Sequence, residues 1–420
     1  MKNISKKLMA MGVACTMLSG GIVSSAMAEE LRMTIWSANE GHLALFNGIA
    51  DGFVASHPDV TVKFDSLPFS NYTTTVTTQI AGGNAPDLAW ILETTAADFV
   101  NSGALYPLND ALNAAEGYEL SDVSKPPLGL WSKDDAILAM PFSTSPFAMF
   151  VNNDLIKAAG AQSPAELIAA GEWNWENAIK TASAVGATGK GGLIVRDFKY
   201  QNWKNLASIW SGWDAAPWSA DGKDCAFAEP EMVSAMNFIH DAIFEKNAIP
   251  GPGESVDFFA GDAALTITQI SRASLLPKEN GFDWDLVPLP AGPAGEYSLI
   301  GQAAIGVFAA GKNAELAAEF LAYMTNPENS AKLAQFFPSI RGSLLNAKTL
   351  GETNALLSED QLKKVVIEGI ANGSVIPGHT GFAQIEQIVR AGLDAVWVPD
   401  ANVEDALANV CSRIQPLLTR

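Results

Sequence analysis

Leu88-Ala-Trp-Ile-Leu92 is a run of five apolar residues with no polar residue between them. It follows Asn84-Ala-Pro-Asp87 and precedes a segment that is expected to be helical, residues 95–102. A strand without polar alternation is buried on both faces, which is typical of a parallel sheet covered by helices. The run therefore favours the α/β class.

The residues before this run extend the same pattern towards the N-terminus. Leu31-Arg-Met-Thr-Ile-Trp36 reads as a strand, and apolar residues at helical spacing follow from Leu43 to Phe53. Alternation over residues 60–64 predicts a second strand, and the Thr-rich stretch 71–80 predicts a helix. This β-α-β-α-β order predicts a doubly wound α/β lobe.

The length of 420 residues predicts a second lobe, because one hydrophobic core stops growing at about 250–300 residues. Pro-containing stretches at 141–146 and 288–293 limit regular structure, and we expect the chain to cross between lobes there. Near the C-terminus, apolar spacing over 403–414 predicts an amphipathic helix that Pro416 ends.

The first 28 residues have the features of a secretory signal peptide. Lys2, Lys6 and Lys7 precede an apolar run, and Ala26-Met-Ala28 precedes the expected cleavage between Ala28 and Glu29. No later segment has the length of uninterrupted apolar sequence that a membrane span requires. We therefore expect an exported, periplasmic chain.

Removing those three lysines takes the formal net charge from −20 to −23. Such a charge repels the phosphates of nucleic acids and anionic lipid headgroups, which argues against both as partners.

The mature chain keeps two cysteines, Cys225 and Cys411, in a compartment that permits disulfides. One bridge or two buried thiols are both compatible with the sequence. The four histidines form no i, i+4 pair and have no neighbouring cysteine, so we expect neither a zinc site nor any other metal or cofactor.

Short motifs in order along nearly the whole mature chain resemble the extracellular solute-binding proteins of sugar-type ABC importers, the maltose-binding-protein-like family. These motifs are Ile35-Trp36, His57-Pro-Asp-Val60, Ile80-Ala-Gly-Gly-Asn-Ala-Pro-Asp87, Gly103-Ala-Leu-Tyr-Pro-Leu108, Met140-Pro141, Phe150-Val-Asn-Asn-Asp-Leu155, Trp175-Glu-Asn177, Phe259-Ala-Gly-Asp-Ala-Ala264, Trp284-Asp-Leu-Val-Pro-Leu-Pro290, Ala317-Ala-Glu-Phe-Leu321, Asn326-Pro-Glu328 and Pro338-Ser-Ile-Arg341.

The resemblance implies a type II periplasmic-binding-protein fold, with two doubly wound α/β lobes joined by a multi-strand hinge. The N-lobe would take residues 29–140 and 288–337, and the C-lobe residues 141–287 and 338–420. It also implies a monomer that captures a sugar or sugar derivative between the lobes, without catalysis. The partner would be an inner-membrane ABC permease with its ATPase.

Ligands of open α/β sheets lie beyond the carboxyl ends of the strands, so the loops that follow the strands are the candidate site. A sugar needs flat aromatic surfaces for its apolar face and polar side chains for its hydroxyl groups. Trp36 ends the first predicted strand, and Asn39, Glu40 and His42 follow it. Either Ser37 or Asn39 is expected to cap the next helix, with Ser37 favoured.

Further candidates follow the other strands. Glu93 comes directly after Leu88–Leu92, where a carboxylate is placed to accept from a hydroxyl group. Ser143 and Ser145 lie in the expected crossover, and Gln302 lies in a later loop.

Arg272 and Arg341 lie in loops where the resembled family has cleft residues, and a guanidinium can hold paired hydroxyl groups or an anion. Many relatives carry a Gly-Pro-Trp type of sequence near the first of these, and here Thr268-Gln-Ile-Ser-Arg272 replaces it. This departure argues against a maltodextrin. The resemblance also implies that His379 and Phe382 bring a C-lobe aromatic ring to the sugar.

Other prominent residues have structural interpretations. Asp87 precedes its strand and so lies at the sheet edge opposite the cleft, and Trp203 and Trp210 are expected in the core.

Two alternative functions remain open at this point. A binding protein for glycerophosphodiesters, or for another phosphorylated or sulfonated polyol, would use Arg272 and Arg341. A secreted glycosidase would need a carboxylate pair such as Asp283 and Asp285, which alternate along a predicted strand.

Overall fold

The computed structural model describes residues 29–277, 281–353, 356–375 and 378–419. The predicted signal peptide, residues 1–28, lies outside these ranges. Within them, no helix is long and apolar enough to cross a bilayer.

One large sheet runs through the molecule, with neighbouring strands in the order β2-β1-β3-β10-β6-β8-β7. β11 adds to β10, β9 adds to β6, and β4 and β5 form a separate two-stranded sheet. The strands are β1 (Glu29–Ile35), β2 (Val60–Ser66), β3 (Leu88–Leu92), β4 (Ser132–Lys133), β5 (Ala136–Ile137), β6 (Ala139–Asn152), β7 (Gly191–Val195), β8 (Ala263–Gln269), β9 (Trp284–Val287), β10 (Ser298–Val307) and β11 (Gly373–Val375).

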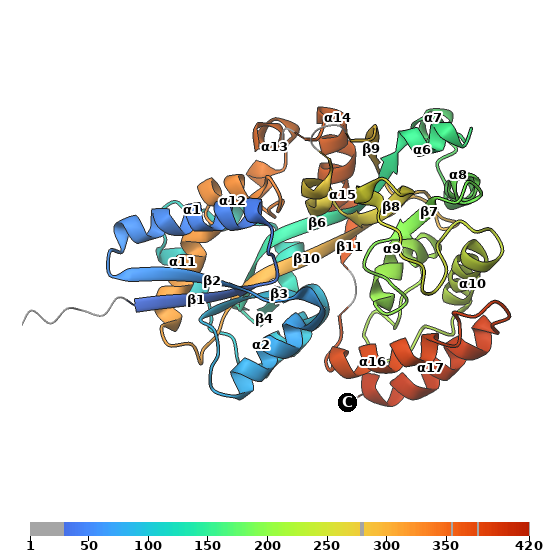
Figure 1. Cartoon of the computed structure of the whole chain (residues 1–420). Helices are drawn as coiled ribbons and strands as arrows, with labels where there is room; N and C mark the ends of the chain where they lie inside the picture. Colours follow the sequence, from blue (N-terminus) through green and yellow to red (C-terminus); the bar gives the residue numbers. More distant parts are fainter. Residues whose placement is uncertain (1–28, 278–280, 354–355, 376–377, 420) are drawn as a thin grey trace, which may run out of the picture.

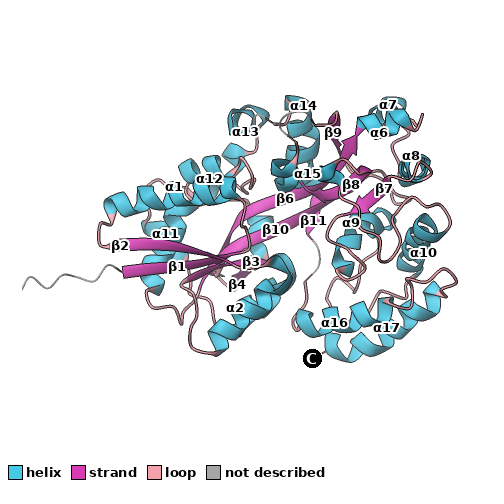
Figure 2. Ribbon diagram, viewed as in Figure 1, coloured by secondary structure: helices cyan, strands magenta, loops and turns pink. Residues whose placement is uncertain are grey.

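Helices surround this sheet (Figure 2). They are α1 (Glu40–Ser56), α2 (Tyr72–Ala81), α3 (Ala96–Ser102), α4 (Asn109–Ala114), α5 (Lys125–Gly129), α6 (Asn153–Ala158), α7 (Pro164–Ala170), α8 (Trp175–Gly186), α9 (Ala207–Trp210), α10 (Pro230–Phe244), α11 (Ala314–Met324), α12 (Pro327–Leu333), α13 (Ala347–Thr353), α14 (Glu359–Gln361), α15 (Glu368–Asn372), α16 (Phe382–Leu393) and α17 (Val403–Leu418).

The predicted parallel pairing is correct at the two ends of the sheet and wrong in the middle. β1 pairs in parallel with β2 and β3, and β7 pairs in parallel with β8. The ladders β3–β10, β10–β6 and β6–β8 are antiparallel. β6 and β10 run through the centre of the molecule in opposite directions (Figure 1), so the pairing changes where the chain passes from one end to the other.

Two hydrophobic cores lie at opposite ends of the sheet. The N-terminal core surrounds β1, β3, α1 and α11 and includes Leu31, Phe46, Trp90 and Phe320. The C-terminal core surrounds β7, α8, α10 and α17 and includes Trp175, Leu193, Ile239 and Leu407. A smaller third cluster includes Phe150, Phe258 and Val365.

β6 and β10 contribute to both main cores. Met140 and Phe142 pack in the N-terminal core, whereas Met149 packs in the C-terminal core. In β10, Ala303–Val307 lie against the N-terminal core and Leu299 lies against the C-terminal core. The exact lobe boundaries stay a prediction, but the side chains change cores inside these two strands.

The expectation that Pro141 and Pro146 limit regular structure is wrong, because both lie inside the fourteen-residue strand β6. The β6–β10 register shifts at Ala303/Ala304, where Ala304 pairs with Pro141 and Ala303 pairs with Ser143. A β-bulge accommodates a residue without an N–H in this ladder. The residue that the bulge adds is Phe142.

Pro416 does not end the last helix, since α17 continues to Leu418. Ile414 and Leu418 on either side of Pro416 are buried in the C-terminal core, and this packing offsets the hydrogen bond that proline removes. Cys411 of α17 forms a disulfide with Cys225. The sequence was compatible with one bridge or with two buried thiols, and the structure contains the bridge.

Candidate functional site

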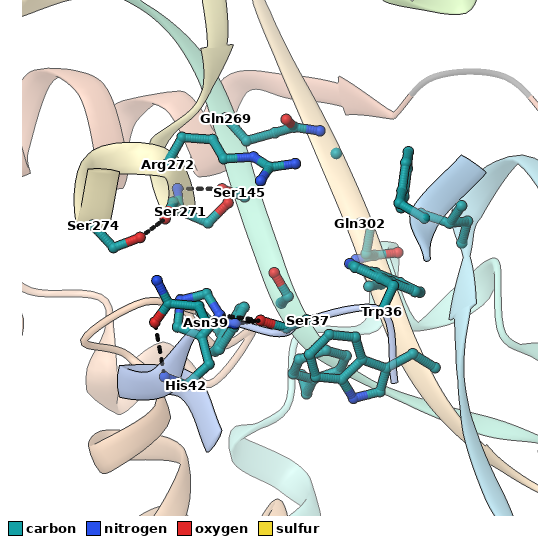
Figure 3. Close-up of a pocket in the computed structure, with 18 of the residues that line it drawn as sticks. Trp36, Ser37, Asn39, His42, Ser145, Gln269, Ser271, Arg272, Ser274 and Gln302 are labelled. Carbon is teal, nitrogen blue, oxygen red and sulfur yellow. Dashed lines mark hydrogen bonds between the residues drawn. The ribbon is translucent and has the colours of Figure 1, made fainter. Parts of the chain in front are cut away.

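A cavity of about 400 Å³ lies between the two main cores, where β1, β3, β6, β8 and β10 present their loops and bends. Its lining consists of Trp36, Ser37, Ala38, Asn39, His42, Phe69, Trp90, Leu92, Glu93, Phe142, Ser143, Ser145, Asp197, Asn205, Gln269, Ser271, Arg272, Ser274, Leu275, Gly301, Gln302, Ala303 and Phe337. Figure 3 shows Gln269, Ser271, Arg272 and Ser274 on one side and Ser37, Asn39 and His42 facing them on the other.

Aromatic side chains form much of the wall on the side of the N-terminal core. The ring of Trp36 meets Phe69, Tyr72 and Trp90 edge-on, with ring centroids 5.9, 5.0 and 4.8 Å apart. Phe142, the residue added by the bulge in β6, stacks on Trp90 at 4.7 Å. These contacts hold the rings in place and leave part of Trp36 accessible to the cavity.

The start of α1 forms the neighbouring part of the wall. Asn39 caps the helix, because its Oδ1 accepts from the His42 backbone N–H at 3.1 Å. The preference for Ser37 as the cap is therefore wrong. Its hydroxyl group instead lies 2.8 Å from Nδ1 of His42 and accepts from the backbone N–H of Asn39.

His42 is neutral at physiological pH in this setting. Burial, together with the positive charge of Arg272, lowers its pKa from 6.5 to about 4. His42 therefore presents an uncharged imidazole group at the wall of the cavity.

Glu93 begins the 3-10 turn that follows β3 and is buried. One carboxylate oxygen accepts from the backbone N–H of Gln302 at 3.2 Å. Burial disfavours the charged form and raises the pKa of Glu93 to about 7, while Lys204 acts in the opposite direction. Near neutral pH, both the protonated and the ionised form of the Glu93 side chain are therefore populated.

Gln302, Ser143 and Ser145 lie on the central strands. The Gln302 amide accepts from Trp131 Nε1 at 2.7 Å and donates to Thr144 Oγ1 at 3.4 Å, so both of its ends have partners within the protein. Ser145 Oγ accepts from the backbone N–H of Ser271 at 3.2 Å. That bond ties β6 to the opposite wall.

The wall on the side of the C-terminal core carries the charged groups. Arg272 lies in the 3-10 segment after β8, and its guanidinium is 3.5 Å from the carboxylate of Asp197. Asp197 follows β7 in a left-handed backbone conformation with φ +61°. Asn202 and Asn205 hold this loop by donating side-chain hydrogen bonds to the carbonyl groups of Asp197 and Arg196.

Comparison with known proteins connects this architecture to one family. The family model for bacterial extracellular solute-binding proteins matches residues 38–331. The chain belongs to this family.

Three known proteins are similar to this solute-binding protein in sequence or structure. The sn-glycerol-3-phosphate-binding periplasmic protein UgpB of Escherichia coli (strain 536) is 25% identical over 445 residues, covering 96% of each chain. The ABC substrate-binding protein Lmo0181 of Listeria monocytogenes, solved with cycloalternan, has a TM-score of 0.80 at 20% identity and covers 93% of this chain and 99% of its own. UgpB of Mycobacterium tuberculosis, solved with glycerophosphocholine, has a TM-score of 0.73 at 18% identity, covering 92% and 98%.

The predicted fold class and the function of solute binding for an ABC importer are confirmed by this membership. The family's description is one of binding, not catalysis.

Of the residues predicted to bind the solute, eight line the cavity of this solute-binding protein. They are Trp36, Asn39, His42, Glu93, Ser143, Ser145, Arg272 and Gln302. Their contact with a solute stays a prediction.

Arg341 does not line the cavity, and its predicted role is wrong. It is 2% exposed, and its guanidinium donates to the carbonyl groups of Thr325, at 3.2 and 2.9 Å, and Glu119, at 3.2 Å. It also lies 4.5 Å over the ring of Tyr118. Arg341 thus holds loops of the N-terminal core together.

Three other predicted residues also lie outside the lining. Glu40 is exposed in the first turn of α1. Phe382 is buried in the C-terminal core beside Trp203, with ring centroids 6.0 Å apart. His379 lies at the edge of Trp218, and its Nε2 is 2.9 Å from the carbonyl of Gly222.

The lining includes groups that the sequence did not single out, chiefly Asp197 and Asn205. Both follow β7, whose sequence Gly191-Gly-Leu-Ile-Val195 was not recognised as a strand. The signal that was available is a short apolar run followed by a polar loop. Recognising that strand would have brought this loop into the candidate site.

The structural interpretations agree with the geometry. Asp87 is 2% exposed and accepts from the backbone N–H groups of Arg32 and Lys312. Trp203 and Trp210 are buried in the C-terminal core. Asp283 and Asp285, the pair on which a glycosidase would depend, are not part of the lining.

Proposed function

We propose that the protein is the periplasmic substrate-binding subunit of an ABC importer and that its cavity captures a sugar or sugar derivative as a monomer. The observation that carries this proposal is the composition of the two walls. Trp36 lies on one side of the cavity, and Gln269, Ser271 and Arg272 lie on the other (Figure 3). Trp90 and Phe142 pack with Trp36, and Asp197 lies beside Arg272. A sugar has an apolar face and a polar rim, and it matches such a pair of walls.

The volume and placement of the cavity support the same proposal. About 400 Å³ lies within the range of small-molecule sites, which starts at about 300 Å³. Because each main core supplies one wall, movement of one end of the molecule against the other would enclose a solute.

An anionic polyol is the second candidate, and Arg272 is the observation that favours it. The two UgpB relatives bind glycerol-3-phosphate or glycerophosphocholine according to their names. However, Asp197 already lies 3.5 Å from this guanidinium, and Arg341 is engaged elsewhere. A phosphomonoester dianion such as sn-glycerol 3-phosphate would therefore meet, in the lining, the Arg272 cation that the Asp197 carboxylate already neutralises, so we favour a solute with less negative charge.

The test is a thermal-shift and calorimetric panel on mature protein that has been unfolded and refolded to remove carried-over solute. The panel contains monosaccharides, disaccharides, polyols, sugar acids, sn-glycerol 3-phosphate and glycerophosphocholine. A ligand that binds only the folded state raises the melting temperature. A shift with saccharides supports the proposal, a shift with the phosphorylated compounds alone supports the second candidate, and no shift with any compound contradicts both.

A further inference from the structure

His42 presents a hydrogen-bonding atom that has no partner among the described residues. The side chain is about nine-tenths buried, and its ring packs against Phe336 and Phe337 with ring centroids 4.7 Å away in each case. Its Nε2 is buried and accepts from or donates to no group in the part of the chain that the structure describes, although the residue lines the cavity.

The contacts of Ser37 indicate which nitrogen of His42 carries the proton. The Ser37 oxygen accepts from the Asn39 backbone N–H at 3.3 Å and lies 2.8 Å from Nδ1 of His42. If the Ser37 hydroxyl group donates to Nδ1 of His42, then the Ser37 hydroxyl, the Asn39 backbone N–H and Nδ1 are all paired, and Nε2–H alone of these groups is not. In the opposite tautomer the serine proton also lacks a partner among the described residues, so the Nε2–H tautomer is favoured.

Trp90 supplies a second buried donor in the same lining. The residue is 1% exposed, and no described residue accepts a hydrogen bond from its Nε1. Its ring packs against Phe337 at 5.8 Å, and Phe337 also contacts His42. Buried polar groups of folded proteins are rarely left unpaired, and two unpaired donors on residues of one cavity lining point to an acceptor supplied from outside.

We propose that the cavity contains a subsite for an oxygen atom of the solute that accepts hydrogen bonds, and that His42 Nε2–H and Trp90 Nε1–H donate to it. The acceptor is a carboxylate oxygen of a sugar acid, or a ring, glycosidic or hydroxyl oxygen of a neutral sugar. Ser37 is a positioning residue that holds the tautomer of His42. This inference rests on the proposed binding of a sugar or sugar derivative.

The first experiment measures the stability of the ligand-free protein. His42→Phe removes an unpaired donor, keeps an aromatic ring beside Phe336 and Phe337, and takes an acceptor only from the half-buried Ser37 hydroxyl group, so the melting temperature should fall little or not at all. The matched control is His240→Phe, because His240 is also buried but its Nε2 is paired with the Val398 carbonyl at 2.9 Å. The control variant should melt at a lower temperature. Equal losses in the two variants would overturn the inference.

The second experiment observes the tautomer directly by ¹⁵N NMR of histidine-labelled protein, with His42→Phe identifying the signal among the four histidines. We expect the Nε2–H form in the wild type and a mixture of tautomers in Ser37→Ala. A wild-type signal from the Nδ1–H form would overturn the assignment. A purely structural role for Ser37 would leave the tautomer unchanged.

The third experiment compares D-glucuronate, D-glucose, methyl α-D-glucoside and every saccharide found by the panel. For each probe that binds the wild type, His42→Phe should weaken binding by about tenfold or more, the loss expected for one buried hydrogen bond. Preference for glucuronate over glucose assigns the acceptor to a carboxylate oxygen. Glucose and methyl α-D-glucoside share the ring oxygen, so similar losses of affinity in His42→Phe for these two probes assign the acceptor to an oxygen that both contain. Unchanged affinity overturns the subsite. If no saccharide binds, the proposed function fails, and the stability and tautomer measurements still decide the state of His42.

Discussion

The guanidinium of Arg272 lies 3.5 Å from the carboxylate of Asp197, and both side chains line the cavity. Arg272 follows β8, and Asp197 follows β7, so two neighbouring parallel strands bring the pair together. About a third of each side chain is exposed. The contact is therefore too accessible to contribute much stability by itself, and both groups remain available to a solute.

We predict that Arg272→Gln weakens solute binding by about tenfold to a hundredfold, since hydrogen bonds to charged groups contribute about 1.5–3 kcal/mol. The unfolding free energy should change little because the pair is partly solvated. Isothermal titration with the best saccharide of the panel measures the first quantity, and urea denaturation measures the second.

The matched control is Arg413→Gln, which removes an exposed arginine of α17 that is not part of the cavity lining. It changes the net charge by the same amount. Equal losses of affinity in the two variants would mean that Arg272 acts only through overall charge.

Arg341→Met should have the opposite profile. The substitution leaves the carbonyl groups of Thr325 and Glu119 without their donor inside the N-terminal core, which we expect to cost about 3 kcal/mol of unfolding free energy. Solute affinity of the folded fraction should stay within about twofold. Loss of affinity with unchanged stability would restore Arg341 to the binding site.

The elements that sequence reasoning identified are those with a local signal. Alternation or continuous apolar sequence located β1, β2 and β3, helical spacing located α1, and a Thr-rich stretch before two glycines located α2. The site residues that follow these elements, such as Trp36 and Glu93, were found for the same reason. Once a strand is recognised from its residue pattern, the residues that directly follow it can be read from the sequence.

The errors concern long-range contacts. The resemblance places Arg341 in a loop with cleft residues, yet its guanidinium donates to the carbonyl group of Glu119, 222 residues away. Asp197 was missed because its place depends on a left-handed loop after an edge strand that contains two glycines. Proline marked breaks at 146 and 416 where tertiary packing maintains the strand and the helix. The spacing of residues in the sequence predicts neither the long-range hydrogen-bond partners of a side chain nor the tertiary packing around a proline.

Reduction of the Cys225–Cys411 bridge should destabilise the C-terminal core. The bridge joins residues 186 positions apart, and a closed loop of that size contributes about 5 kcal/mol in the chain-entropy description. We expect the Cys225→Ser/Cys411→Ser variant to unfold at lower urea concentration, with retained solute binding in the absence of denaturant. Identical urea midpoints for oxidised and reduced wild-type protein would contradict this prediction.

Glu93 makes stability depend on pH in a defined direction. Its pKa in the folded protein is about 7, against an ordinary value of 4.5, because burial disfavours the carboxylate. The folded state therefore holds its proton more tightly than the unfolded chain, so this group's favourable contribution is complete below about pH 4.5 and is lost as pH rises to about 7. The loss amounts to about 3 kcal/mol.

Glu93→Gln removes this titration while its amide oxygen can still accept from the backbone of Gln302. We expect the unfolding free energy of the variant, relative to wild type, to rise between pH 4.5 and 7 and to stay level above pH 7. Urea denaturation of both proteins across that range measures the difference. A difference that is constant with pH would show that the Glu93 carboxyl group ionises alike in the folded and unfolded chain, and that its burial beside the cavity carries no electrostatic cost.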